Sequence, residues 1–200
     1  MTDDSLKNSF ARDIALMKQV GINVAVVHGG GPQIDEQLQK VGIKRNFKES
    51  LCLKEEILSD NILIETIEVV VNKCINSFKT KGKVLFCGNG GSAADAQHLA
   101  AELSGRYYYD RPPLNSEALH VNTSYLTAVA NDYSYNEVYA RLIKAVGLRG
   151  DVLIGLSTSG NSKNIINVLK KAKKKKVFSI SFLGNKGGEC KKISDLSYIV

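Results

Sequence analysis

From residue 46 onward, short apolar runs alternate with amphipathic segments, and this alternation constrains the fold more than any other feature. The apolar runs predict four strands and the start of a fifth, over 83–88, 117–122, 151–157, 177–183 and 196–200. Helices are predicted over 48–59, 61–80, 92–104, 123–131, 134–146 and 161–175. Continuous apolar strands that alternate with helices indicate a parallel sheet covered on both faces. We therefore predict an α/β fold with a doubly wound sheet, and ligand binding at the carboxyl ends of its strands.

The first 45 residues do not share this rhythm. They predict a helix over 8–20, a strand over 23–27, a glycine turn over 29–31 and a short helix over 32–41. We therefore expect two parts, an appended helix–strand–helix fragment at 1–45 and an α/β domain at 46–200.

Composition supports a globular chain in a reducing compartment. Apolar residues make up 44% of the 200 residues and charged residues 24%, which is enough to build a packed core. No apolar run approaches the roughly 18 residues that a membrane span needs, and charges interrupt the first twenty residues, unlike a secretory signal. The four cysteines stand singly at positions 52, 74, 87 and 190, which favours reduced thiols and a cytoplasmic protein.

The net charge of +7 comes mainly from one lysine run. Six lysines between Lys170 and Lys176 supply six of these charges, at the end of a predicted amphipathic helix. Lysines at a helix C-terminus complement the helix dipole, and no aromatic residues are interleaved as in many nucleic-acid surfaces. We therefore expect a solvated helix end and no nucleic-acid partner, and the lack of a run long enough to span a membrane gives no expected membrane partner either.

Two loops that follow predicted strands carry residues suited to a phosphorylated ligand. The first, Gly88-Asn-Gly-Gly-Ser92, combines glycines that allow close backbone approach with the start of a helix. The second, Ser157-Thr-Ser-Gly-Asn-Ser162, places four hydroxyls in six residues, again before a helix. A single hydroxyl would suffice for helix capping, so the four together favour a phosphate cradle that needs no lysine.

Three further polar groups are candidates with strong structural alternatives. His98 and Glu102 are four residues apart and share a helix face, where they could hold a metal, transfer protons or form an ordinary exposed pair. Asn131 and Asp132 near a predicted helix end are by themselves no more than a capping signal. Arg111 lies in a predicted loop, where its guanidinium could meet phosphate or a neighbouring subunit.

Residues 46–200 resemble the phosphoheptose isomerases of the sugar-isomerase, or SIS, domain family. The resemblance rests on motifs in one order: Gly88-Asn-Gly-Gly-Ser-Ala-Ala-Asp95, Gln97-His-Leu-Ala-Ala-Glu102, Gly105-Arg-Tyr107, Arg111-Pro112, Ala130-Asn-Asp-Tyr133 and Gly150-Asp-Val-Leu-Ile-Gly-Leu-Ser-Thr-Ser-Gly-Asn-Ser162. It implies a flavodoxin-like sheet of five strands, N-terminal helices and a homotetramer with active sites at subunit contacts. It also implies isomerisation of sedoheptulose 7-phosphate to D-glycero-D-manno-heptose 7-phosphate, the first step toward activated heptose for surface polysaccharide such as lipopolysaccharide.

The same resemblance implies roles for individual residues. Ser157, Thr158, Ser159 and Ser162 would hold the phosphate, and Asn89, Gly90, Ser92, Asn131 and Asp132 would bind or position the sugar. Glu102 would be the acid/base that moves a proton between C1 and C2 through an enediol, and His98 and Glu102 would be two zinc ligands.

The chain departs from this family's pattern at its C-terminus. The family has a later helix whose glutamine and histidine complete the metal and acid/base set, whereas this chain ends at Val200. The other histidines, His28 and His120 (the latter on a predicted strand), do not replace them. We therefore expect a domain truncated at its C-terminus that binds phosphosugar, with a partial proton-transfer and metal set.

A second resemblance concerns the N-terminal fragment. Residues 1–14 and the run Val26-Val-His-Gly-Gly-Gly-Pro-Gln-Ile34 resemble the start of N-acetylglutamate kinase. A fragment of 45 residues is too short to bury a kinase core, so kinase activity is not expected. The alternative to an isomerase is a non-catalytic SIS module that binds a phosphosugar or a protein partner such as the replication initiator, although Glu102 and Ser157-Thr-Ser159 favour the enzyme.

Overall fold

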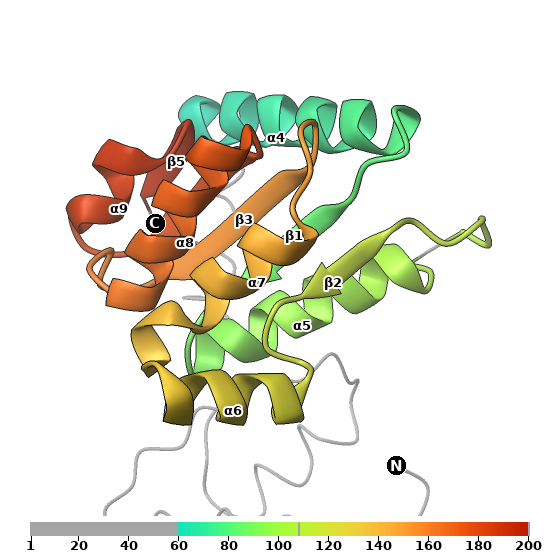
Figure 1. Cartoon of the computed structure of the whole chain (residues 1–200). Coiled ribbons are helices and arrows are strands. Elements are labelled where there is room, and N and C mark those ends of the chain that lie inside the picture. Colours follow the sequence, from blue (N-terminus) through green and yellow to red (C-terminus); the bar gives the residue numbers. More distant parts are fainter. Residues whose placement is uncertain (1–59, 108, 200) are drawn as a thin grey trace, which may run out of the picture. The chain divides into compact units, whose positions relative to one another are not determined.

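The computed structural model describes residues 60–107 and 109–199, and the chain runs through them as an alternation of helices and strands (Figure 1). The elements are α4 (Asn61–Lys79), β1 (Val84–Cys87), α5 (Gly91–Ser104), β2 (Ser116–Ala118), α6 (Thr123–Asp132), the 3-10 helix η1 (Tyr135–Glu137), α7 (Val138–Val146), β3 (Val152–Ser157), α8 (Lys163–Lys175), β4 (Phe178–Leu183), α9 (Gly188–Ile193) and β5 (Leu196–Ile199). The predicted helix at 48–59 and the fragment at 1–45 lie outside the described residues.

The five strands form one sheet in the order β2-β1-β3-β4-β5, and every neighbouring pair is parallel. This is the flavodoxin-like order, in which the chain reverses direction across the sheet between β1 and β3. In the register, Val84 of β1 lies opposite Val152 of β3, so these strands start and end at the same edges. The predicted fold class is confirmed.

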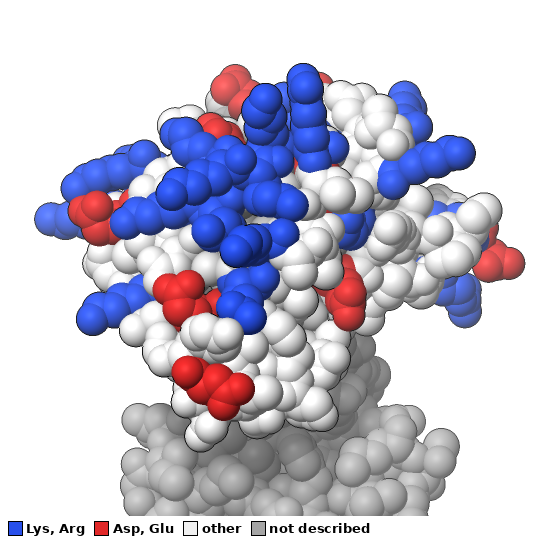
Figure 2. Space-filling model, viewed as in Figure 1, with Lys and Arg blue, Asp and Glu red and all other residues white. Residues whose placement is uncertain are grey.

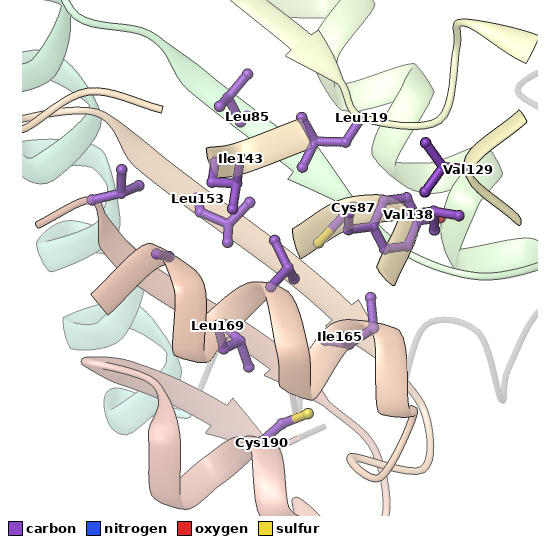
Figure 3. Close-up of a cluster of buried hydrophobic side chains, with 14 of the residues drawn as sticks. Leu85, Cys87, Leu119, Val129, Val138, Ile143, Leu153, Ile165, Leu169 and Cys190 are labelled. Carbon is purple, nitrogen blue, oxygen red and sulfur yellow. The ribbon is translucent and has the colours of Figure 1, made fainter. Parts of the chain in front are cut away.

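Helices cover both faces of the sheet and bury two apolar clusters. On one face, Leu85 and Leu153 pack with residues of α6, α7, α8 and α9 (Figure 3). On the other, Val84 and Phe86 pack with residues of α4 and α5. Alternate residues of β1 thus enter opposite clusters, as expected of a strand that is buried on both faces. No described helix is long and apolar enough to cross a membrane.

The prediction differs from the structure at the end of β2 and between β4 and β5. The strand expected at 117–122 ends at Ala118, because Asn122 instead caps α6: its Oδ1 accepts the Tyr125 N–H at 3.0 Å. His120 therefore lies in a turn, not on a strand. The short helix α9 between β4 and β5 was not predicted.

Candidate functional site

The glycine loop at residues 88–91 joins β1 to α5 and leaves the start of that helix accessible. Gly88 is required by packing, because a Cβ at this position would overlap the Ser92 carbonyl. Nothing lies within 4 Å of a Cβ built at Gly90 or Gly91, and Gly90 provides no side chain to cap α5. The Ala93 N–H donates to the Gly90 carbonyl at 3.0 Å, so the N–H groups of Gly91 and Ser92, at the positive end of the dipole, are the ones that suit an anion or a sugar hydroxyl.

The hydroxyl loop, residues 157–162, joins β3 to α8 at the same edge of the sheet. The buried Ser157 Oγ accepts the Gly160 N–H at 3.2 Å and lies 3.4 Å from Ser162 Oγ. Ser162 is the N-cap residue of α8, yet its side chain makes no capping hydrogen bond. Thr158 and Ser159 are exposed. The four hydroxyls are therefore not there simply to cap the helix.

The α9 helix and the turn before it hold the hydroxyl loop in place. Gly160 has a φ of 64° and packs so closely on Gly187 that a Cβ would overlap the Gly187 carbonyl. Its own carbonyl accepts the Cys190 N–H at 2.9 Å, and Asn161 Oδ1 accepts the Glu189 N–H at 3.0 Å. An element that the sequence reasoning missed thus shapes the predicted phosphate cradle. Burial raises the pKa of the Cys190 thiol to about 11, so that side chain stays protonated at neutral pH.

A pair of amides connects the glycine loop to the first turn of α8, directly after the hydroxyl loop. Asn89 Nδ2 donates to Asn164 Oδ1 at 2.9 Å, and Asn164 Nδ2 donates back to Asn89 Oδ1 at 2.8 Å. Tyr135 in η1 donates its hydroxyl to Asn89 Oδ1 at 3.4 Å, and the buried Tyr139 donates to the Gly88 carbonyl at 2.5 Å. Burial is the main cause that raises the pKa of Tyr139, so its hydroxyl remains a donor.

These connecting residues were missed by the sequence reasoning. Asn164 is 3% exposed, and its position in the first turn of α8 beside Asn89 is the signal that could have suggested it. Tyr135 was not among the predicted site residues. Its contact with Asn89 spans 46 residues and depends on the fold.

His98 and Glu102 are together on α5, as their spacing predicts. His98 Nε2 lies 3.2 Å from Glu102 Oε1, and the side chains are 75% and 34% exposed. Glu102 comes ten residues after Ser92, which places it about 15 Å further along the helix axis. The first turn of α5 and this pair are therefore at different places on the same helix.

Asn131 and Asp132 form the exposed end of α6, where Asn131 Nδ2 donates to Asp132 Oδ1 at 3.0 Å. This is the C-terminal end, so the pair does not cap a helix start. Arg111 is engaged elsewhere: its guanidinium donates to the carbonyls of Glu102 and Leu103 at 2.8 and 2.9 Å, at the end of α5. These hydrogen bonds help to terminate the helix, and a contact of Arg111 with phosphate or with a neighbouring subunit stays a prediction.

Two other features contain none of the predicted site residues. His120 Nδ1 is buried without a hydrogen-bond partner, and burial lowers the pKa of the imidazole, which favours its neutral form. A shallow hollow of about 190 Å³ contains none of the predicted site residues; it is lined by Glu137, Ala140, Asn167, Lys170, Lys171 and Lys174.

Comparison with known proteins places this arrangement in a family. The model of the SIS domain matches residues 47–184, which include both loops and all of α5. The chain belongs to the SIS domain family. Within it, the chain belongs to the phosphoheptose isomerases: it is 48% identical to the phosphoheptose isomerase of Sulfurimonas denitrificans over 158 residues, 79% of this chain and 81% of the relative. The Helicobacter pylori phosphoheptose isomerase is 47% identical over 84% of this chain and 83% of its own.

Solved phosphoheptose isomerases share the fold as well as the sequence. The Neisseria gonorrhoeae structure matches with a TM-score of 0.67 and 38% identity, covering 81% of each chain. The Francisella tularensis structure matches with a TM-score of 0.71 and 28% identity, covering 85% of this chain and 86% of its own. The SIS domain resemblance that the motifs carry is thus confirmed over most of the chain.

Proposed function

We propose that this SIS domain protein isomerises sedoheptulose 7-phosphate to D-glycero-D-manno-heptose 7-phosphate, the first step toward activated heptose for surface polysaccharide. One observation carries the proposal: two helix starts without side-chain caps meet at neighbouring strand ends and are tied together by the Asn89–Asn164 amide pair. Such a pair of helix starts suits an anion and the polar chain attached to it. Membership of the phosphoheptose isomerases supplies the reaction.

The phosphate is assigned to the hydroxyl loop. Ser157, Thr158, Ser159 and Ser162 would donate hydroxyls to its oxygens, and the start of α8 would contribute N–H groups and the positive end of its dipole. The exposure of Thr158 and Ser159 supports this assignment, because a ligand can reach them without a rearrangement of the core.

The sugar is assigned to the other loop and to the end of α6. Gly90 leaves room for close approach, Asn89 and Ser92 lie at the start of α5, and Asn131 and Asp132 are exposed at the end of α6. These groups would bind hydroxyls along the open chain. Amide and carboxylate oxygens accept from hydroxyls, so the set can orient the carbonyl end of the substrate.

Glu102 is proposed as the acid/base. Its carboxylate would take a proton from C1 of the ketose while the oxygen on C2 gains one, which gives an enediol. The proton would then return to C2 as the hydroxyl on C1 loses its own, and the aldose results with no net gain or loss of protons. This transfer requires the carboxylate within hydrogen-bond reach of both carbons.

Because Glu102 lies about 15 Å along α5 from Ser92, we propose that it serves the loops of another copy of the chain. Helix α4 exposes large aliphatic residues that no other described residue buries: Ile62, Ile64, Ile67, Val69, Val71 and Ile75, which are 42–70% exposed. Such a surface is unusual for a monomer and suits contact with a second copy. The proposed assembly is a homotetramer with shared sites.

Zinc is the metal that the family resemblance suggests, and His98 and Glu102 provide a nitrogen and an oxygen donor of the right kind. The described residues contain no group of three or more metal-binding side chains, so the set is incomplete in the part of the chain that the structure covers. A bound zinc ion would act as a Lewis acid toward the substrate oxygens. In the steps above the carboxylate carries the proton from C1 to C2, and the proton that the C1 hydroxyl loses balances the one that the C2 oxygen gains.

Conversion of sedoheptulose 7-phosphate, followed by NMR, tests the reaction. We expect Glu102→Gln to lower the rate about a hundredfold to ten-thousandfold, since an amide cannot accept the proton, with little effect on ligand affinity. Glu117→Gln, at an exposed carboxylate on β2, is the matched control and should retain the rate. If the wild-type chain and Glu102→Gln both bind the sugar phosphate and neither converts it, the protein is a non-catalytic SIS module.

Complementation tests the shared site. Glu102→Gln and a variant without the loop hydroxyls, Ser157→Ala/Ser159→Ala, should each be inactive alone. Co-assembled in equal amounts, they should restore about a quarter of the sites, because a site is intact where one copy provides both hydroxyls and the other the carboxylate. No recovery in mixed oligomers would mean that each chain builds its site alone.

A proposed cytoplasmic location agrees with the free thiols of Cys74, Cys87 and Cys190.

A further inference from the structure

The amino edge of the sheet, opposite the candidate site, gathers cations from several separate elements. The loops before β1, β3 and β4 meet there: Val152 N–H donates to the Lys83 carbonyl at 3.0 Å, and Gly150 N–H donates to the Lys176 carbonyl at 3.5 Å. We define the amino-edge patch as the exposed residues that these segments and the ends of α4, α7 and α8 contribute: Lys79, Lys81, Lys144, Val146, Leu148, Arg149, Lys173, Lys174 and Lys176. Figure 2 shows the basic side chains, in blue, gathered over α8 and the surface next to it.

The charges of the patch are not neutralised within the described part of the chain. The one carboxylate between these loops, Asp151, is 1% exposed and already binds the Lys83 ammonium at 2.7 Å. The other ion pairs of the described residues join His98 to Glu102 and Lys192 to Glu189, so none includes a cation of the patch. Helix α8 itself contains no acidic residue.

The helix dipole explains only part of this arrangement. Lysines favour a helix C-terminus, but neighbours such as Lys170 and Lys174, four residues apart, repel each other. Moreover, Lys81 and Arg149 lie in loops outside any helix and still face the same edge. A set of like charges drawn from separate segments is typical of a surface that meets an anionic partner.

An apolar pair lies among these cations. Leu148 is 61% exposed and Val146 is 38% exposed, between Lys144 and Arg149. Exposed aliphatic side chains at a loop tip, surrounded by lysines, can enter the boundary between headgroups and acyl chains while the ammonium groups meet anionic lipids. Nucleic acid is less well matched. The patch has no aromatic side chain for base stacking, and α7 and α8 present their C-terminal carbonyls there, whereas phosphates are bound by N–H groups at helix N-termini.

We propose that the amino-edge patch binds the surface of an anionic lipid bilayer, with Leu148 inserted at the headgroup level. This peripheral contact differs from the sequence-based expectation of no membrane partner, which rested on the absence of a spanning segment. The contact lies at the edge of the sheet opposite the two site loops, so it leaves them accessible to a soluble substrate.

Sedimentation with lipid vesicles tests the proposal on the full chain. We expect binding to vesicles of phosphatidylcholine with about one-third phosphatidylserine, and none to phosphatidylcholine alone. Lys173→Glu/Lys174→Glu should bind at least about thirtyfold more weakly, since each lysine near a charged surface contributes about fivefold. Leu148→Ser, which preserves the charge, should bind about tenfold more weakly.

The matched control is Lys163→Glu/Lys186→Glu, which changes the net charge equally but near the carboxyl edge. It should bind within about twofold of the wild type, since a surface contact is screened beyond about 10 Å. Equal loss in both double variants would overturn the proposal, because net charge alone would then account for binding. Wild-type binding by Leu148→Ser, or displacement from vesicles by duplex DNA at equal phosphate concentration, would also overturn it.

Discussion

At the carboxyl edge of the sheet, α5 and α8 begin and present N–H groups, hydroxyls and amides. At the amino edge, α4, α7 and α8 end beside a surface of lysines. The two site loops, residues 88–92 and 157–162, contain no lysine or arginine at all. The difference fits the two proposals made for these edges: shaped neutral donors would recognise a single phosphate, whereas flexible charges would suit an extended anionic surface.

The largest expected effect tests how much Asp151, at the amino edge of the sheet, contributes to the stability of the fold. Asp151 accepts the N–H groups of Lys83 and Leu148 at 3.0 and 2.8 Å and binds the Lys83 ammonium. Asp151→Ala should lower the free energy of unfolding by about 3–5 kcal/mol, because it leaves a largely buried cation unpaired. Urea unfolding measures this, with the exposed Asp110→Ala as control.

The same variant also shows how independent the edges are. Asp151 immediately precedes the six residues of β3, so it lies about 20 Å from the hydroxyl loop. The folded Asp151→Ala protein should therefore bind sugar phosphate as the wild type does. A clear loss of affinity, under conditions where the variant remains folded, would show that the two edges are coupled and do not act independently.

The next effect concerns the backbone of the hydroxyl loop. Gly160→Ala should cost about 2–4 kcal/mol, because the residue has a positive φ and its Cβ would overlap the Gly187 carbonyl. The displaced loop should also bind sugar phosphate more weakly. Calorimetric titration and urea unfolding measure the two effects.

Gly150→Ala is the matched control at the amino edge. Gly150 also has a positive φ, of 94°, but nothing lies within 4 Å of its Cβ position. It should cost only about 1–2 kcal/mol and leave ligand affinity unchanged. Equal effects of the two substitutions would mean that the contact between Gly160 and Gly187 does not shape the site.

The repetitive parts of the fold were predictable because a local pattern encodes them. The run Val84–Cys87 contains only apolar residues, and such a run indicates a central strand. In the structure all four residues are buried. In contrast, α9 has six residues and starts at a glycine, which is too short for helical periodicity to show. The predicted end of β2 was wrong because Leu119 and Val121 continue an alternating apolar pattern typical of a strand, whereas Asn122 acts as a helix cap.

The candidate site likewise has parts that the sequence predicts and parts that depend on the fold. Both loops could be found from their glycines and hydroxyls after predicted strands, and the His98–Glu102 pair from its spacing. The Asn89–Asn164 pair joins positions 75 residues apart, and such long-range pairing depends on strand order. The roles of the individual site residues in binding and proton transfer stay predictions.

The smallest expected effect distinguishes a hydroxyl that binds ligand from one that ends a helix. Ser159 is exposed in the hydroxyl loop, and its Oγ accepts the Asn161 N–H at 3.1 Å. Ser159→Ala should weaken sugar-phosphate binding about tenfold, since a hydrogen bond to a charged group is lost, with the unfolding free energy nearly unchanged.

Thr80 provides the matched hydroxyl at the amino edge, where its Oγ1 donates to the Asn76 and Ser77 carbonyls at the end of α4. Thr80→Ala should leave sugar-phosphate affinity within about twofold of the wild type and change the unfolding free energy by about 1 kcal/mol or less. The two substitutions therefore separate affinity from stability, one at each edge. If Ser159→Ala binds as tightly as Thr80→Ala, the phosphate does not rest on this hydroxyl, and the assignment of the loop must rely on its N–H groups.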